Sequence, residues 1–279
     1  MPESDAALPE LPPARALAWS EWALDHDLSP SPAIALWRPE GVHVALGLAQ
    51  SVEKEVRLGA NGGLNAGLVR RQSGGGAVLL YPGVLCWEAI AGLDFVKRAG
   101  GGDGIRAAYR ALCGPVIAGL GRLGVSAFFA GVSDLAVDGA AEEGNRRKVA
   151  GTAQLRRRGR ALVHGALLAE ADVSAMSEYL LPPSAAPEYR DGRSHRGFCV
   201  SLKELLGRGD AHPGAVLRET AAAIAEAARE AGWRVLPPPS ALAPPAADLE
   251  RNKYLSPAWN WRRERRRTEK KSTTTESRR

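Results

Sequence analysis

The chain has 279 residues, of which 45% are hydrophobic and 24% charged, the composition of an ordinary globular protein with a sizeable core. It contains no run of about 18 apolar residues, which excludes a transmembrane helix. The acidic N-terminus lacks the pattern of a signal peptide. The three cysteines have neither a metal-binding spacing nor an even number for pairing. We therefore expect a cytoplasmic protein.

The net charge of +6 comes from one end of the chain. Residues 262–279 contain nine Lys/Arg and three Glu, so the rest of the chain is neutral. A neutral body gives no electrostatic argument for nucleic-acid binding. We expect a flexible, proline-rich leader over residues 1–13, a folded domain over residues 14–261 and a disordered basic tail over residues 262–279.

Hydrophobic periodicity predicts helices and strands interspersed along the domain. Helices are expected at 14–27, 51–59, 105–122, 172–181, 200–206 and 212–232. Strands are expected at 33–37, 42–48, 68–71, 77–80, 84–90, 125–129, 134–137, 147–154, 161–168 and 233–236. Residues 156–160 are expected to form a hairpin tip, and residues 237–245, with five prolines, an extended linker. Several antiparallel strands with intervening helices indicate an α+β fold, a mainly antiparallel sheet backed by helices.

The first chemical motif is a run of three glycines at positions 74–76. It follows the basic pair Arg70 and Arg71 and the hydroxyl of Ser73, and lies between two apolar runs. Consecutive glycines are costly to order, so they occur where the backbone turns sharply or lies against something else. The stretch is either a tight hairpin or a site for an anion or a polar headgroup.

The second motif is the segment R-K-V-A-G-T-A-Q at residues 147–154, followed by H-G-x-L-L from His164. Lys148 stands among small and apolar residues, and Gly151 allows close approach of a ligand. A lysine directed into a cleft can neutralise a carboxylate or phosphate and stabilise charge on an acyl carbonyl. The alternative is a solvent-facing strand lysine, because Arg147 adjoins it.

In this order and spacing, R-R-x-S-G-G-G, R-K-V-A-G-T-A-Q and H-G-x-L-L resemble the lipoate–protein ligase A and octanoyltransferase family, which also includes the catalytic domain of biotin protein ligases. The resemblance runs from about residue 15 to residue 261. It implies the catalytic-domain fold of this family, with Lys148 as the catalytic residue that contacts the acyl carbonyl. It also implies a substrate pocket formed by Arg71, Ser73, Gly74, Gly75, Gly76, Val78, Cys86, Gly151, Thr152, His164 and Gly165.

Two departures from the family pattern affect the expected chemistry. Ser133-Asp134 resembles the Asn–Asp pair that lies near the nucleotide and Mg²⁺ in ligases, but Ser133 replaces the Asn, which weakens the implied use of ATP. After the glycines the family commonly has a His-containing turn. Leu80 stands there in this chain, so we expect a more apolar acyl pocket.

Octanoyltransferases of this family form a thioester on a cysteine. No cysteine lies in the stretch before Lys148, where one class carries it, whereas Cys199 falls after the H-G motif, in the region of another class. Cys199 is therefore the candidate nucleophile, with Arg193, His195 and Arg196 as neighbours that can lower its thiol pKa.

Three hypotheses remain open from the sequence. The first is a ligase that attaches lipoate or octanoate in amide linkage to an acceptor lysine, using ATP and Mg²⁺ through an acyl-adenylate. The others are an octanoyltransferase that uses an octanoyl-carrier-protein thioester, and a non-catalytic protein that binds a lipoyl-like ligand. The implied partner is the lipoyl domain of a 2-oxoacid dehydrogenase (E2) or the glycine cleavage H protein. Ligases continue past a segment like Trp259–Trp261 into an accessory domain, so an accessory subunit is a further expected partner.

Overall fold

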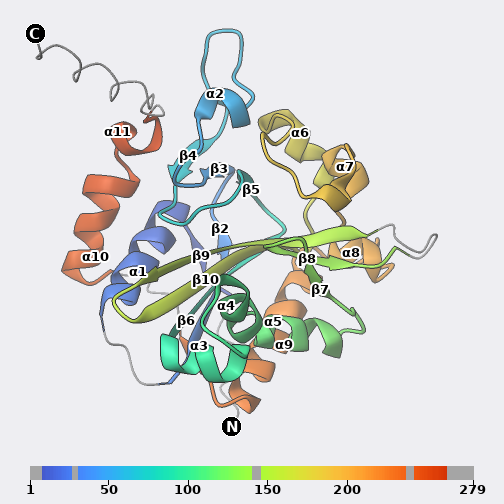
Figure 1. Ribbon diagram of the computed structural model, residues 1–279. Coiled ribbons are helices and arrows are strands. Elements are labelled where there is room, and N and C mark those ends of the chain that lie inside the picture. The colour runs from blue at the N-terminus through green and yellow to red at the C-terminus, as the bar shows by residue number, and fades with distance from the viewer. Residues whose placement is uncertain (1–7, 27–30, 140–145, 237–241, 263–279) are drawn as a thin grey trace, which may run out of the picture.

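A mainly antiparallel sheet of eight strands forms the centre of the computed structural model, which describes residues 8–26, 31–139, 146–236 and 242–262 (Figure 1). The strand order is β1-β2-β6-β10-β9-β8-β7, and β11 also pairs with β2. The strands are β1 (Glu10–Leu11), β2 (Ala33–Pro39), β6 (Val84–Gly92), β7 (Phe128–Ala130), β8 (Asp134–Val137), β9 (Arg147–Arg157), β10 (Arg160–Leu168) and β11 (Arg234–Leu236). Only the short strands β1 and β11 pair in parallel, among the described residues of this sheet. The predicted α+β fold with a mainly antiparallel sheet is confirmed.

One face of this sheet is covered by helices (Figure 1). These are α3 (Leu93–Gly100), α4 (Ile105–Leu112), α5 (Gly114–Arg122) and α9 (Ala215–Glu230). Side chains alternate between the two faces of a strand, so Leu85 and Trp87 of β6 join the core under the helices, while Cys86 points to the opposite face. Trp87 is fully buried at the centre of this core.

The opposite face is covered by a second, three-stranded sheet with the order β4-β3-β5. Its strands are β3 (His43–Leu46), β4 (Gly67–Arg70) and β5 (Val78–Leu80). Helices α1 (Pro13–Asp25), α2 (Val52–Glu55), α6 (Met176–Tyr179) and α7 (His195–Phe198) and the short helical turns η1 (Val173–Ala175) and η2 (Glu188–Arg190) complete this part of the molecule. Helix α8 (Leu202–Leu205) instead contributes Leu202 to the core under the helices of the other face. A second hydrophobic cluster lies between the two sheets, and the glycine motif connects β4 to β5.

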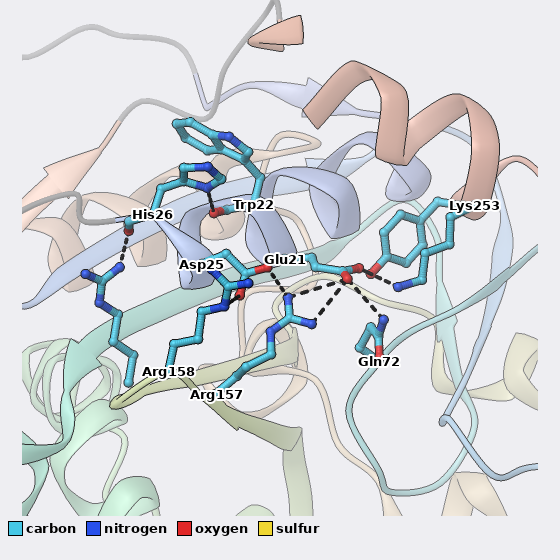
Figure 2. A network of polar contacts seen from close by, with 10 residues as sticks. Glu21, Trp22, Asp25, His26, Gln72, Arg157, Arg158 and Lys253 are labelled. Atoms are coloured by element: carbon cyan, nitrogen blue, oxygen red, sulfur yellow. Dashed lines mark hydrogen bonds and ion pairs between the residues drawn. The ribbon is translucent and has the colours of Figure 1, made fainter. Parts of the chain in front are cut away.

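The last described segment returns to helix α1. Helices α10 (Pro244–Leu249), η3 (Glu250–Tyr254) and α11 (Pro257–Asn260) follow one another there. Glu21 of α1 binds Lys253 and Tyr254 of η3, each at 2.6 Å, and also contacts Gln72 and Arg157 (Figure 2). One buried carboxylate therefore joins α1, the start of the glycine motif, β9 and the C-terminal helices.

Several predicted elements differ from the observed ones, each for a local reason. The predicted helix 105–122 is two helices, α4 and α5, because Pro115 cannot donate within a helix and fits only the first turn of a new one. Of the predicted linker 237–245, residues 237–241 lie outside the described residues, while Pro244 begins α10, since proline is tolerated at the start of a helix. Helix α3 was not predicted, and α2 is shorter than the expected helix 51–59.

Residues 1–7 of the expected leader and 263–279 of the expected tail lie outside the described residues, whereas β1 belongs to the large sheet. The 156–160 segment forms the predicted hairpin between β9 and β10. No helix in the described ranges has the length and apolar character that crossing a membrane requires.

Candidate active site

A cavity of about 630 Å³ lies between the two sheets and gathers most of the residues singled out from the sequence. Its walls include Arg71, Gly75, Gly76, Val78, Cys86, Ser133, Asp134, Lys148, Gly151, Thr152, His164, Gly165 and Cys199. Two predicted pocket residues, Ser73 and Gly74, are not among the lining residues; Ser73 contacts His164, and the carbonyl of Gly74 accepts a hydrogen bond from Arg71. Segments far apart in the sequence thus meet at one site.

Lys148 reaches the cavity because of a β-bulge. The register between β8 and β9 runs from Leu135↔Ala150 to Ala136↔Lys148, which leaves Val149 as an extra residue. Val149 and Ala150 both pack into the core on the helix side. Lys148 therefore returns to the cavity face, whereas strict alternation from Ala150 would have turned it toward the helices. The alternative of a solvent-facing lysine is wrong, since only 24% of its side chain is exposed.

The ammonium of Lys148 is held by a carboxylate. Lys148 Nζ lies 2.7 Å from Asp134 Oδ1, and Asp134 Oδ2 accepts a hydrogen bond from Tyr189 at 2.9 Å. A Cβ on Gly151 would lie 3.0 Å from Lys148 Nζ, so the glycine leaves room for the lysine tip. The ion pair thus directs a preorganised positive charge into the cavity.

The Mg²⁺ expected at Ser133 and Asp134 has few protein ligands in this arrangement. Both Asp134 oxygens are engaged, and the Ser133 carbonyl accepts from the Thr152 hydroxyl at 2.7 Å. The described residues contain no group of three His, Cys, Asp or Glu side chains that could hold a metal. In this arrangement Asp134 is committed to Lys148 and Tyr189, and Mg²⁺ binding at Ser133 and Asp134 stays a prediction.

The buried guanidinium of Arg71 holds the backbone of the glycine motif in place by hydrogen bonds. Its guanidinium donates to the carbonyl oxygens of Ala45, Gly74 and Gly76 at 2.7–3.0 Å and to the Ser73 hydroxyl at 3.1 Å. Burial lowers its pKa to about 10, so it stays protonated at neutral pH. Its donors are directed at the loop, which fixes the loop's path along the cavity.

Arg70, the other arginine of the basic pair, is a buried structural residue and not a surface charge. Arg70 is fully buried, and its Nη1 donates to the carbonyl oxygens of Gly47 and Gln50. Its Nη2 donates to the carbonyl of Asn260 at 3.0 Å, while its backbone N–H donates to the Asn260 side chain at 2.9 Å. Arg70 therefore ties the entry of the glycine motif to α11.

The two residues of the H-G motif lie against opposite faces of the large sheet. His164 Nε2 lies 2.7 Å from Ser73 Oγ on the cavity side, which links β10 to the glycine motif. Its Nδ1 lies 3.3 Å from the buried carboxylate of Glu88, directly opposite on β6. A side chain at Gly165 would point to the helix side of the sheet, where its Cβ would lie 2.1 Å from the Trp87 ring. The glycine thus makes room for the central tryptophan.

Cys199 lies in the cavity beside Lys148, and the two residues form an isolated parallel β-bridge. The expectation that cations lower its thiol pKa is corrected. Burial raises the pKa of Cys199, and the opposing effect of Lys148 and Arg190 is smaller. Cys86 is also buried, and burial raises its pKa well above the ordinary value. At both thiols burial therefore disfavours the reactive thiolate, and at Cys199 the neighbouring cations offset part of this effect.

Two residues were missed from the sequence: Arg190, which lines the cavity, and Tyr189, which bonds Asp134; His195 was expected only as a neighbour of Cys199 and also lines the cavity. They follow or end a segment rich in Pro, Ser and Ala, where no periodicity marks a buried residue. Arg190 stacks on Phe198 at 4.9 Å. Burial, together with Arg190 and Lys148, lowers the pKa of His195 to about 4, so this imidazole is neutral at pH 7.

Known proteins match this chain over most of its length. A sequence model of the lipoyl protein ligase A/B catalytic domain matches residues 12–225. Octanoyltransferase LipM of Bacillus subtilis is 26% identical over 269 residues, which cover 87% of this chain and 90% of LipM.

Solved structures show the same fold. A bipartite lipoate protein ligase from Thermoplasma acidophilum, studied with its E2 lipoyl domain, has a TM-score of 0.65 at 21% identity and covers 91% of this chain and 94% of its own. A lipoate-protein ligase A bound with ATP has a TM-score of 0.63 at 22% identity, with 91% and 96% covered. Since the family match spans well over half of the sequence, this chain belongs to the lipoyl protein ligase A/B catalytic-domain family.

Proposed function

We propose that this protein is an enzyme that attaches lipoate or octanoate in amide linkage to a lysine of an acceptor domain, by the ligase route. The observation that carries the proposal is the placement of Lys148, whose ammonium is anchored by Asp134 over Gly151 inside the cavity. A fixed cation at this position neutralises the carboxylate of a bound acid and stabilises the oxyanion that develops when its carbonyl is attacked.

The ligase route needs two steps. An oxygen of the acid's carboxylate attacks the α-phosphorus of ATP, which forms the acyl-adenylate and releases pyrophosphate. The acceptor lysine, as a free amine, then attacks the acyl carbonyl; AMP leaves, and the amine loses a proton. Lys148 stabilises the negative charge on oxygen in both steps, and the backbone of the glycine motif follows the acyl chain. The ATP-bound relative supports ATP as the activating substrate.

A second candidate is supported by a separate observation. Cys199 lies in the cavity next to Lys148, and one relative of this chain is an octanoyltransferase. In this route the Cys199 thiolate attacks an octanoyl thioester, releases the carrier thiol and passes the octanoyl group to the acceptor amine. The raised pKa of Cys199 favours the ligase route, because a buried neutral thiol is a weak nucleophile.

The partner that we propose is a lipoyl acceptor domain. The Thermoplasma ligase was studied with its E2 lipoyl domain, and that ligase is bipartite, which supports both the acceptor and a separate accessory subunit.

The test measures the intact mass of a lipoyl domain after incubation with the protein. One reaction contains lipoate, ATP and Mg²⁺, and the other contains octanoyl-carrier protein. We expect a lipoyl mass increase that requires ATP and is lost in Lys148→Ala. Removal of a single oxyanion-stabilising donor costs about 10²–10³-fold in rate. A mass increase only with the octanoyl thioester, lost in Cys199→Ser, would establish the transferase route instead. Full activity of Lys148→Ala would contradict both.

A further inference from the structure

Arg190 is a buried arginine in the wall of the cavity that has no carboxylate partner of its own. It ends the helical turn η2, is 8% exposed and lines the cavity. Its Nε donates to the carbonyl of Arg193 at 2.9 Å, whereas its two Nη groups have no hydrogen-bond or ion-pair partner among the described residues. A buried charge without a partner costs free energy, so its presence in a ligand cavity points to an anionic group on the ligand.

Two contacts hold the guanidinium of Arg190 in place. Its Cζ lies 4.9 Å from the centre of the Phe198 ring, and Phe198 is almost fully buried. The hydrogen bond from Nε to the Arg193 carbonyl fixes the second side of the group. Burial lowers the pKa of Arg190, but a guanidinium keeps its proton at neutral pH. The free Nη groups are therefore preorganised donors that lose little entropy when a ligand binds.

Arg190 lies on the Lys148 side of the cavity. The residue before it, Tyr189, donates to one oxygen of Asp134, and the other oxygen of Asp134 holds Lys148. Arg190 and Lys148 both lower the pKa of His195, so both charges are close to this one imidazole. Asp134 is engaged by Lys148, which leaves the charge of Arg190 uncompensated at this end of the cavity.

We propose that Arg190 binds the phosphate of the acyl-adenylate and of the AMP that leaves from it. The inference rests on the proposed function, which places the acyl carbonyl at Lys148. In an acyl-adenylate the phosphate is joined to the acyl carbon through a single oxygen, so a cation beside Lys148 faces the phosphate. A planar guanidinium can donate to two oxygens of one phosphate, whereas a lysine ammonium acts as a point charge.

The two cations then act on different parts of the same intermediate. When the acceptor amine attacks, a bond forms between its nitrogen and the acyl carbon, and the bond between this carbon and the bridging oxygen breaks. The electron pair stays on the oxygen of AMP, and the proton of the amine goes to solvent. Lys148 stabilises the negative charge on the carbonyl oxygen, and Arg190 stabilises the charge that develops on the leaving phosphate.

The experiment measures the binding of AMP, adenosine and octanoate to the full chain by calorimetry at pH 7. In Arg190→Met we expect AMP to bind about 10- to 100-fold more weakly, the ratio that hydrogen bonds to a charged group provide. Adenosine and octanoate lack the phosphate, so their affinities should be unchanged. Arg190→Lys keeps the charge without the planar group, so its loss of AMP affinity should be smaller. Octanoyl transfer from synthetic octanoyl-AMP to a lipoyl domain should also slow in Arg190→Met.

The matched control is Arg193→Met. Arg193 stacks on the same Phe198 ring at 5.3 Å, but it donates to the carbonyl oxygens of Tyr189 and Arg190 and does not line the cavity, so AMP affinity should be unchanged.

AMP that binds to both Arg190 variants as tightly as to the parent, or to Arg190→Lys alone where Arg190→Met does not fold, would overturn the assignment of Arg190. An equal loss of octanoate affinity, or undiminished transfer from octanoyl-AMP, would do the same. Each of these results leaves the proposed function intact. A parent protein that binds no AMP and gives no ATP-dependent mass increase would overturn both.

Discussion

Substitution of the glycine in the H-G motif separates a packing role from a ligand role. In Gly165→Ala the new Cβ would lie 2.1 Å from the Trp87 ring, a distance far inside van der Waals contact. Trp87 is fully buried among the helices that cover the sheet, so it has no free space to move into. We therefore expect loss of stability rather than a specific loss of ligand binding.

The magnitude follows from the cost of overpacking. Extra carbon atoms in a close-packed core cost about 1–3 kcal/mol, and the rigidity of the indole ring and the strand places Gly165→Ala at the upper end. For a domain of this size, about 3 kcal/mol lowers the melting temperature by roughly 6–12 °C. Urea unfolding followed by circular dichroism measures the free energy directly. The control is Gly121→Ala on helix α5, where a Cβ meets no atom within 4 Å and helix propensity favours alanine.

A double-mutant cycle tests whether the contact with Trp87 causes the loss of stability. Trp87→Phe removes the ring atoms nearest Gly165, so Gly165→Ala should cost less in that background than alone. If Gly165→Ala unfolds like the parent protein yet binds no lipoate, the reasoning is refuted and the glycine contacts the ligand. Equal costs of Gly165→Ala in both backgrounds would refute the assigned clash.

Three further predictions concern buried charged and titratable side chains, and two of them use substitutions. Arg70→Met leaves several buried carbonyls without a donor, so we expect a loss of about 3 kcal/mol or more in urea unfolding, whereas the exposed Arg38→Met, which loses one ion pair with Glu10, should lose under about 1 kcal/mol. A loss below 1 kcal/mol for Arg70→Met would contradict this reading. Because burial raises its pKa, Cys199 should react slowly with iodoacetamide at pH 7 and faster only above pH 9, as followed by peptide mass mapping; rapid reaction at pH 7 would favour the transferase route. Between pH 6.5 and about 4, the imidazole of His195 takes up a proton in the unfolded chain and not in the folded one, so stability falls as the pH drops through this range. His195→Gln should therefore lose less stability than the parent between pH 7 and pH 5, and an identical loss would contradict the lowered pKa.

Local patterns determined much of the architecture. Strict alternation along β6 places Leu85 and Trp87 under the helices and Cys86 on the opposite face. This pattern can be predicted from the sequence because successive side chains of a strand point to opposite faces of the sheet. The three motifs identified the family and named the cavity residues, because glycines, a lysine among apolar residues and an H-G pair are local signals. The break at Pro115 was also present in the sequence, since proline restricts its own neighbourhood.

Only the tertiary structure decided which way several of these side chains point. Lys148 reaches the cavity through a bulge at Val149, and a bulge depends on the pairing of two strands rather than on either strand alone. The adjacent arginines 70 and 71 look alike in the sequence, yet the first ties down α11 and the second shapes the glycine motif. The contact between Glu88 and His164 gave no signal either, because the two residues lie far apart along the chain and meet only in the pairing of β6 with β10. The burial and the hydrogen-bond partners of a side chain depend on residues that are distant along the chain, so they are defined only in the folded structure.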